Sequence, residues 1–272
     1  MPPSPNRSGS RPRPRPGTQA IERAVRVLTE VTARSRFGWR PTDLAARCGL
    51  DRGTTHRILG CLARERLVHR RAQDGHYVPG PLLFELALAL PAYDELREAC
   101  APILARVARR SRGYALFSVR SFDDAVCVAS AGTPAYLGTA FDVGTRRPLV
   151  TIAAGVAILI ALPRAEARGI VDRGLVTQPD RTPLTRMWRR SLALGFAANV
   201  GYTARGVNAV AVPLRDPDGT PFGSLAVAAA AAELPAPRLA ETAATLADDA
   251  RRIERLARQV LPEGAYNAPR PS

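Results

Sequence analysis

The chain has 272 residues, of which 46% are hydrophobic, and a formal net charge of +15 at pH 7. This length allows one large domain or two ordinary ones. All 39 basic residues are arginine, which excludes a lysine nucleophile, and no histidine follows His76, which excludes a Ser-His-Asp site in the larger C-terminal part. The apolar runs are too short to span a bilayer, and no apolar segment follows the first arginines. We therefore expect a cytoplasmic protein with no membrane partner.

Positive charge is concentrated towards the N-terminus. Residues 1–80 carry 16 arginines and six acidic residues, whereas residues 81–272 carry 23 and 18. This asymmetry is expected of a nucleic-acid-binding module joined to a second domain, although a basic solvated surface would look similar. The four cysteines are widely spaced and form no C-x-x-C pair, so neither a metal site nor a disulfide framework is indicated, and no cofactor is predicted.

The first 80 residues predict three helices and a hairpin. Residues 1–17, rich in arginine and proline, are expected to be a disordered arm. Apolar residues at helical spacing follow, and an Asp-Gly turn separates two extended runs, which is typical of a winged helix-turn-helix at residues 18–80. The helices are expected from Thr18, from Pro41 to Gly49, and from a cap at Asp51 or Thr54 to about residue 64, with strands at 67–71 and 76–79.

The remaining residues predict an α+β domain. Linker helices are expected at residues 81–111, a sensor-type domain at 112–262 and a loose tail at 263–272. Apolar residues of the first linker helix suit contact between subunits, although they could also pack within one chain. Strands are expected at 114–120, 125–129, 135–141, 196–200, 207–214 and 222–229, and helices at 150–162, 163–173, 184–194 and 234–260.

Four segments together are distinctive, and a fifth accompanies them: AIERAVRVL (20–28), LAARCG (44–49), GTTHRILGCL (53–62) and DGHYVPGP (74–81), followed by GVNAVAVPLRDPDGTPFGSL (206–225). Through them the chain resembles the IclR-type (isocitrate lyase regulator-type) bacterial transcription regulators over about residues 18–260. That family joins a winged helix-turn-helix to a GAF-like domain that binds a small effector. The resemblance implies a sequence-specific DNA-binding regulator, more often a repressor, and not an enzyme. It also implies a homodimer or homotetramer on a palindromic operator in double-stranded DNA.

The third predicted helix supplies most of the expected DNA contacts, because the second helix of a helix-turn-helix lies in the major groove with its N-terminal residues at base edges. The two threonines could instead cap and pack the helix, and Arg57 could pair with Glu22 or Glu65. The candidates are Arg52, Gly53, Thr54, Thr55, His56 and Arg57 on the helix, and Arg70, Arg71, Gln73 and His76 on the wing, where they would reach the flanking backbone.

The expected effector site departs from the family pattern. Better-known members place an acidic residue, a cysteine and two serines at the polar end of the pocket. Aligning Gly206 with the family glycine puts Asn199, Ala209, Ala226 and Ala228 at those positions. We expect an apolar ligand, since an unpaired buried carboxylate would cost several kcal/mol. The other candidates for the lining are Ser130, Thr145, Arg146, Thr151, Gly155 and Asn208.

Two alternatives remain open at this stage. The chain could be a ligand-independent DNA-binding protein whose C-terminal domain only dimerises around a vestigial pocket, a reading favoured by the basic arm. An enzyme is disfavoured, because Asp123, Asp124 and Glu166 would be its acid–base candidates and no paired carboxylates occur at a useful spacing.

Overall fold

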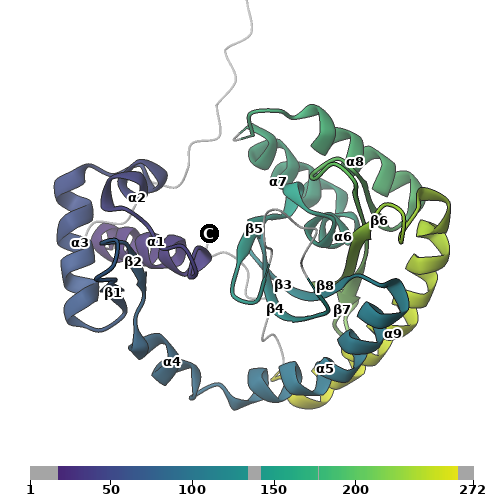
Figure 1. The fold of residues 1–272 in the computed structure, drawn as a ribbon, viewed down its shortest axis with the longest axis horizontal. Coiled ribbons are helices and arrows are strands. Elements are labelled where there is room, and N and C mark those ends of the chain that lie inside the picture. The colour runs from purple at the N-terminus through teal and green to yellow at the C-terminus, as the bar shows by residue number, and fades with distance from the viewer. Residues whose placement is uncertain (1–17, 134–141, 177, 263–272) are drawn as a thin grey trace, which may run out of the picture. The chain divides into compact units, whose positions relative to one another are not determined.

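The structure, a computed structural model, describes residues 18–133, 142–176 and 178–262. The chain divides into two compact units: the N-terminal unit ends at Glu85 and the C-terminal unit begins at Leu86. Figure 1 labels their helices and strands. The predicted arm at residues 1–17, the predicted strand at 135–141 and the tail at 263–272 lie outside the described residues.

The N-terminal unit consists of three helices followed by a hairpin (Figure 1). Gly49, with a φ of 63°, ends the second helix in the left-handed conformation that glycine adopts readily, and the third helix begins at Arg52. So short a turn between the two helices gives the arrangement of a helix-turn-helix. The elements are α1 (Gln19–Ala33), α2 (Pro41–Cys48), α3 (Arg52–Arg64), β1 (Val68–Arg70) and β2 (Tyr77–Pro79).

A small apolar core joins the three helices. Val31 from α1, Leu44 from α2 and Leu59 from α3 are fully buried in it. Each such side chain contributes about 1.5–3 kcal/mol by leaving water. The N-terminal end of α1 does not contribute to this core, because the apolar side chains of Ile21 and Val25 are 65% and 57% exposed.

The loop between α1 and α2 pairs with the hairpin. The backbone N–H of Trp39 donates to Tyr77 O at 3.0 Å, and that of Tyr77 donates to Trp39 O at 2.9 Å. Gly38 precedes this bridge with a φ of 67°, and a Cβ there would lie 2.8 Å from Val78 Cγ1. Glycine therefore allows both the turn and the close approach of the loop to the wing.

The C-terminal unit is built on a six-stranded antiparallel sheet with the order β5-β4-β3-β8-β7-β6. Its last long strands, β7 and β8, are joined by a turn at residues 216–219, and β8 lies between β7 and β3. The strands are β3 (Tyr114–Ser121), β4 (Asp124–Ala131), β5 (Arg146–Pro148), β6 (Ala197–Val200), β7 (Val207–Arg215) and β8 (Pro221–Ala230).

Helices cover both faces of this sheet (Figure 1). Helices α5 and α9 pack on one face, here called the α5–α9 face, whereas α6 and α8 pack on the other, here called the α6 face. No helix of the described residues is long and apolar enough to cross a membrane. The helices are α4 (Pro81–Ala87), α5 (Pro91–Ser111), α6 (Ala153–Ala161), α7 (Arg164–Val176), α8 (Thr182–Leu194) and α9 (Leu239–Val260), with single 3-10 turns at Leu149–Thr151 and Ala236–Arg238.

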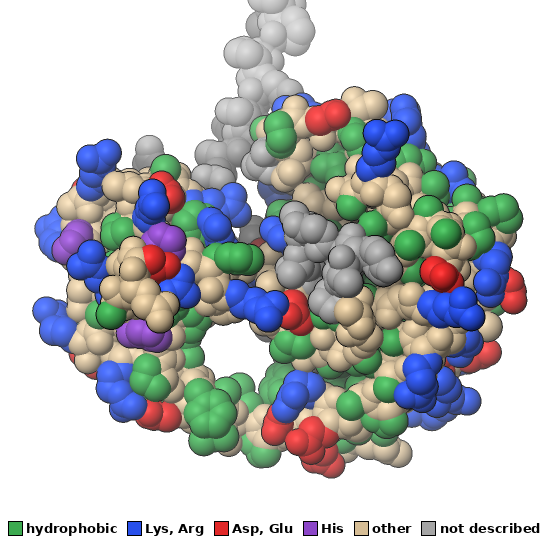
Figure 2. Space-filling model, viewed as in Figure 1, with side chains coloured by type: hydrophobic (Ala, Val, Ile, Leu, Met, Phe, Trp, Pro, Cys, Tyr) green, Lys and Arg blue, Asp and Glu red, His purple; other side chains and the backbone are tan. Residues whose placement is uncertain are grey.

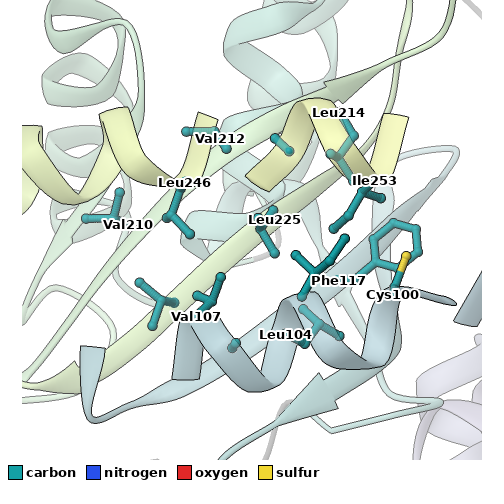
Figure 3. Packing of buried hydrophobic residues seen from close by; sticks show 14 of the residues in the cluster. Cys100, Leu104, Val107, Phe117, Val210, Val212, Leu214, Leu225, Leu246 and Ile253 are labelled. Carbon is teal, nitrogen blue, oxygen red and sulfur yellow. The ribbon is translucent and has the colours of Figure 1, made fainter. Parts of the chain in front are cut away.

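Large side chains fill the core on the α5–α9 face. Phe117 of β3 and Leu225 of β8 point between Leu104 of α5 and Ile253 of α9 (Figure 3). All four are fully buried. On the α6 face the sheet contributes mainly alanines, so the two faces differ in the size of the side chains that they bury.

A buried carboxylate ties α5 to α9. Asp249, whose side chain is 3% exposed, accepts from Arg106 Nη2 at 2.7 Å and from Arg110 Nη2 at 3.0 Å, and lies 3.5 Å from Arg252 Nη1. Charge-assisted hydrogen bonds of this kind fix the orientation of the two helices as well as the distance between them. The predicted fold class, α+β with an N-terminal winged helix-turn-helix, is confirmed.

Candidate nucleic-acid interface and ligand site

The start of α3 is fixed by Asp51. Its Oδ1 accepts from the backbone N–H of Thr54 at 2.8 Å, and this hydrogen bond holds the pKa of the carboxyl below its usual range. Thr55 is 1% exposed, and its hydroxyl donates to Asp51 O at 3.0 Å. The predicted DNA contact of Thr55 is therefore wrong, because its side chain packs inside the unit with Leu59 and Leu62.

The outer face of α3 presents cations to solvent. Arg52, Gly53, His56 and Arg57 are exposed, and Thr54 is half-buried. Arg57 Nη2 donates to Thr54 Oγ1 at 3.3 Å, so these two side chains meet on one turn. No ion pair joins Arg57 to Glu22 or Glu65 in the described part of the chain, and the charge of Arg57 instead contributes to lowering the pKa of Asp51.

Arg64 extends this face, although the sequence analysis did not include it. It lies seven residues, or two turns, beyond Arg57 and is exposed. The signal that could have identified it is this spacing, since residues seven apart share a helix face. Helix α3 thus carries three arginines and no acidic residue.

The wing residues divide into exposed and anchored side chains. Arg70 is exposed and its Nε donates to Gly75 O at 3.2 Å, while Gln73 is exposed at the turn. Arg71 instead donates from Nη1 to Arg36 O at 3.1 Å and from Nη2 to Phe37 O at 3.0 Å. Its Nε donates to Asp74 Oδ1 at 3.1 Å. The three nitrogens of Arg71 are thus used within the chain.

His76 is anchored to the same loop. Its Nδ1 lies 3.0 Å from Phe37 O and 3.2 Å from Asp74 Oδ2, and its Nε2 accepts from Arg40 Nε at 3.3 Å. The Arg71 guanidinium holds the pKa of Asp74 well below its usual range, and Asp74 in turn raises the pKa of Arg71. Arg71 and His76 therefore hold the wing against the loop at Arg36 and Phe37, and their contact with the DNA backbone stays a prediction.

The alanines expected at the effector site form one row across the sheet. Asn199 pairs with Ala209, Ala209 with Ala228, and Ala228 with Tyr114. Ala226 lies in the adjacent row, and its side chain also packs on the α6 face. Cross-strand neighbours in register share one face of a sheet. The structure thus places Asn199 beside three alanine methyl groups on the α6 face of the sheet. These four residues, Asn199, Ala209, Ala226 and Ala228, are here called the alanine floor.

A polar group lies at the β3–β4 end of this row. Tyr114 OH donates to Asp142 Oδ1 at 2.9 Å, and Ser130 Oγ donates to the same oxygen at 3.5 Å. Thr145 Oγ1 donates to the backbone O of Asp142. Burial raises the pKa of Tyr114 to about 12, so the phenol is a neutral donor. Sequence reasoning missed Tyr114 and Asp142, although Asp142 is the only acidic residue between Asp124 and Glu166.

Two of the predicted lining residues lie on the other side of the sheet. Asn208 is 4% exposed and its Nδ2 donates to Leu234 O at 2.9 Å, within the core of the α5–α9 face. Arg146 pairs in register with Val126, which packs on the same face, and its Nη1 contacts Ser121 and Asp124. Their predicted place beside the alanines is wrong, because neighbouring strand residues alternate between faces.

Two further residues predicted to line the effector site, Gly155 and Thr151, have local structural roles. A Cβ on Gly155 would lie 2.3 Å from Leu149 O, so the space beside Gly155 is filled by backbone and holds no ligand. Thr151 Oγ1 donates to Pro148 O at 2.7 Å and closes the turn before α6. The predicted effector contact of Gly155 is therefore wrong, and the hydroxyl of Thr151 is already satisfied within the chain.

Comparison with known proteins gives a consistent result. The model of the bacterial transcriptional regulator IclR C-terminal domain matches residues 92–255, and that of the IclR helix-turn-helix domain matches residues 20–72. The glycerol operon regulatory protein of Streptomyces coelicolor is 26% identical over 79% of this chain and 86% of its own length. The HTH-type transcriptional repressor AllR of Salmonella typhi is 24% identical over 87% of this chain and 89% of its own length.

Solved structures share the fold. An IclR family transcriptional regulator from Brucella abortus has a TM-score of 0.70 at 21% identity and covers 87% of this chain and 91% of its own. An IclR homolog from Microbacterium hydrocarbonoxydans, complexed with 4-hydroxybenzoate, has a TM-score of 0.62 at 23% identity and covers 88% of this chain and 99% of its own.

Proposed function

The chain belongs to the IclR family of bacterial transcriptional regulators, and we propose that it represses transcription in the cytoplasm by binding a palindromic operator as a homo-oligomer and releasing it on binding a small organic effector. The observation that carries the proposal is the outer face of α3. That face offers Arg52, His56 and Arg57 to solvent, with no acidic residue in the helix. Arginine forks of this kind bind guanine edges or phosphates in the major groove.

The homo-oligomer is supported by apolar side chains around α4. Phe84 is 69% exposed, and Leu86, Leu88 and Leu90 are 55%, 64% and 53% exposed. The leucines predicted for this contact divide: Leu86 and Leu90 are exposed, whereas Leu82 and Leu83 are half-buried, as packing within one chain would make them. Exposed apolar side chains gathered within seven residues are typical of a surface that a second subunit covers. Ile21 and Val25 of α1 add to the apolar surface of the N-terminal unit.

The effector that suits the alanine floor is largely apolar and carries no carboxylate near Asp142. A ligand carboxylate there would meet the carboxylate of Asp142, and like charges in a partly buried site repel strongly. A hydroxyl or amide on the ligand could instead donate to it. The Microbacterium hydrocarbonoxydans homolog binds 4-hydroxybenzoate, which is a carboxylate, so the effector proposed for this chain shares at most the aromatic ring of that ligand and differs from it in charge.

A catalytic role is not supported by the acidic residues that an enzyme would use. Each of the three candidate carboxylates is paired with arginine. Burial also raises the pKa of the Cys100 and Cys127 thiols to about 12, which keeps both protonated near neutral pH. The carboxylate pairs are Arg173–Asp123 at 3.0 Å, Arg146–Asp124 at 3.3 Å and Arg120–Glu166 at 2.5 Å.

The operator proposal is tested by fluorescence anisotropy with DNA from upstream of the protein's own gene and with a scrambled duplex of equal length and composition. We expect a preference of roughly a thousandfold or more near physiological salt. Selection of bound fragments from the whole genome finds the site if it lies elsewhere. Equal affinity for the selected and scrambled duplexes would support the ligand-independent alternative with a vestigial C-terminal domain.

The effector proposal is tested on the same protein–operator complex. Neutral aromatic compounds such as phenol and benzamide are titrated against a small dicarboxylate at equal ionic strength. We expect only the neutral compounds to release DNA, since coupling of effector and operator commonly changes affinity by about 5–150-fold. Release by the dicarboxylate alone would contradict the assignment of the alanine floor to an apolar ligand.

A further inference from the structure

A hollow of about 720 Å³ lies on the surface of the C-terminal unit, between α8 and the loop of residues 201–206. The hollow is open to solvent and not enclosed. Four arginines, two hydroxyl groups and a phenol surround it, and no acidic residue does. The lining residues are Arg181, Thr182, Thr185, Arg186, Arg189, Arg190 and Tyr202.

The orientation of α8 follows from its sequence. Leu184, Met187 and Ser191 are buried, which turns the opposite side of the helix outward. Arg186 and Arg189 lie three residues apart on that outer side. Like charges at this spacing repel and destabilise an isolated helix. In the view of Figure 2, several basic side chains lie among apolar and other residues in the region where Figure 1 labels α8.

These arginines lack the partners that other arginines of this unit have. No ion pair of Arg186, Arg189 or Arg190 occurs within the described residues, and Arg190 Nε is buried without a hydrogen-bond acceptor. The nearby carboxylate of Asp180 is used by the backbone, since its Oδ1 accepts from the N–H of Thr182 at 2.9 Å. A buried guanidinium N–H without an acceptor is costly, so the site is incomplete without an acceptor from outside the chain.

The loop side of the hollow is held in place by the sheet. Asn199 Oδ1 accepts from the backbone N–H of Tyr202 at 2.9 Å, and Asn199 Nδ2 donates to Thr203 Oγ1. The ring of Tyr202 packs partly against the core of the α6 face. Because Asn199 also belongs to the alanine floor, one side chain connects the hollow to the candidate effector site.

We propose that this hollow, here called the α8 site, binds a small oxyanion with several negative charges, such as a phosphorylated or polycarboxylate metabolite. Guanidinium groups bind both classes through paired N–H donors, and the threonine and tyrosine hydroxyls can donate as well. None of the residues that line the α8 site belongs to the N-terminal unit or to the alanine floor, although Asn199 of that floor holds the backbone of Tyr202. The α8 site gives the regulator a second ligand input whose chemistry is opposite to that of an apolar effector.

The proposal is tested by isothermal titration calorimetry of the full chain with pyrophosphate and with citrate, in a buffer without phosphate at low ionic strength. The wild type should bind one of the two probes saturably, with one equivalent per chain, and the preferred probe separates phosphate from carboxylate chemistry. Arg186→Gln/Arg189→Gln should weaken that binding at least about tenfold, because two charge-assisted contacts are lost.

A matched control separates a site from general charge. Arg255→Gln/Arg258→Gln on α9 removes two exposed arginines at the same spacing in the same unit, and it should leave binding unchanged. Thermal melts check that both variants fold. Three results would overturn the proposal: no saturable binding of either probe by the wild type, equal weakening by both double variants, or loss of operator affinity in Arg186→Gln/Arg189→Gln with no change in probe binding. The last result would make the face a DNA contact.

Discussion

Helices α3 and α9 carry similar numbers of arginines in opposite electrostatic settings. Helix α3 has three arginines and no acidic residue, whereas α9 has four arginines and four acidic residues. On α9, Asp248 pairs with Arg251 and Asp249 lies within ion-pair distance of Arg252, so part of the positive charge is neutralised within the helix. No residue of α3 can neutralise its arginines in this way. The presence or absence of acidic residues in the same helix therefore distinguishes arginines that stabilise the fold from arginines that we propose bind an anion.

Helix α8 belongs with α3 in this comparison. Among the described α-helices, α3 and α8 are the two that carry arginine without any acidic residue. One of them lies at the recognition position of a helix-turn-helix and the other lines a hollow. The same sequence feature therefore marks both candidate sites, although their expected ligands differ in size.

The largest effect is expected from the arginines of α3. Arg52→Ala/Arg57→Ala should weaken operator binding about a hundredfold or more, since each base-reading arginine contributes roughly 1–3 kcal/mol. Arg255→Ala/Arg258→Ala on α9 is the control, because it removes the same charge from exposed positions. Anisotropy on operator and scrambled duplexes measures both. A similar loss for the two variants would mean that total charge, and not the α3 face, determines binding.

The sequence was sufficient for the outline of this face but not for each residue on it. Asp51 was predicted as one of two caps for α3 and is the one that the structure uses. Thr55 was misplaced, although its spacing from Leu59 and Leu62 is that of a buried helical stripe. The anchoring of Arg71 to Arg36 O could not be predicted, because it joins residues 35 positions apart.

The next effect concerns the arginines that build the fold. Asp249→Asn should lower the free energy of unfolding of the C-terminal unit by about 2 kcal/mol, because ionised hydrogen bonds to a buried carboxylate are lost. The neighbouring Asp248 is 64% exposed and pairs only with the exposed Arg251, so Asp248→Asn should change stability by less than about 0.5 kcal/mol. Urea denaturation measures both. Equal losses would contradict the structural role of the buried network.

At the alanine floor, the sequence correctly predicted which alanines share a face of the sheet, but it wrongly placed Asn208 and Arg146 on that same face. The family alignment placed Ala209, Ala226 and Ala228 together, and the register confirms that they share a face. Asn208 and Ala209 are adjacent in one strand, so strand alternation already argued against placing both in one cavity. The position of Arg146 depended on β5, a three-residue strand without a sequence signal.

A smaller effect is expected at the wing, where contact and positioning give different salt dependences. Arg71→Ala should weaken operator binding several-fold by loosening the loop at Phe37, yet leave the slope of log K against log salt unchanged. Arg70→Ala, if Arg70 contacts phosphate, should reduce that slope by about 1. Anisotropy over a salt series measures both slopes. A reduced slope for Arg71→Ala would instead support the prediction that this residue reaches the DNA backbone.

The smallest effect concerns the carboxylate that begins α3. The hydrogen bond from Thr54 lowers the pKa of Asp51 in the folded state, so its contribution to stability is present above the unfolded pKa near 4 and is lost as the pH falls through the lower folded value. In Asp51→Asn the amide oxygen still accepts from Thr54 but has no charge to lose. The Tm advantage of the wild type over this variant should therefore shrink as the pH falls below about 4. Thermal melts of both proteins at pH 7, 4 and 2.5 measure it, and a gap that stays constant would show that the cap acts by its shape alone.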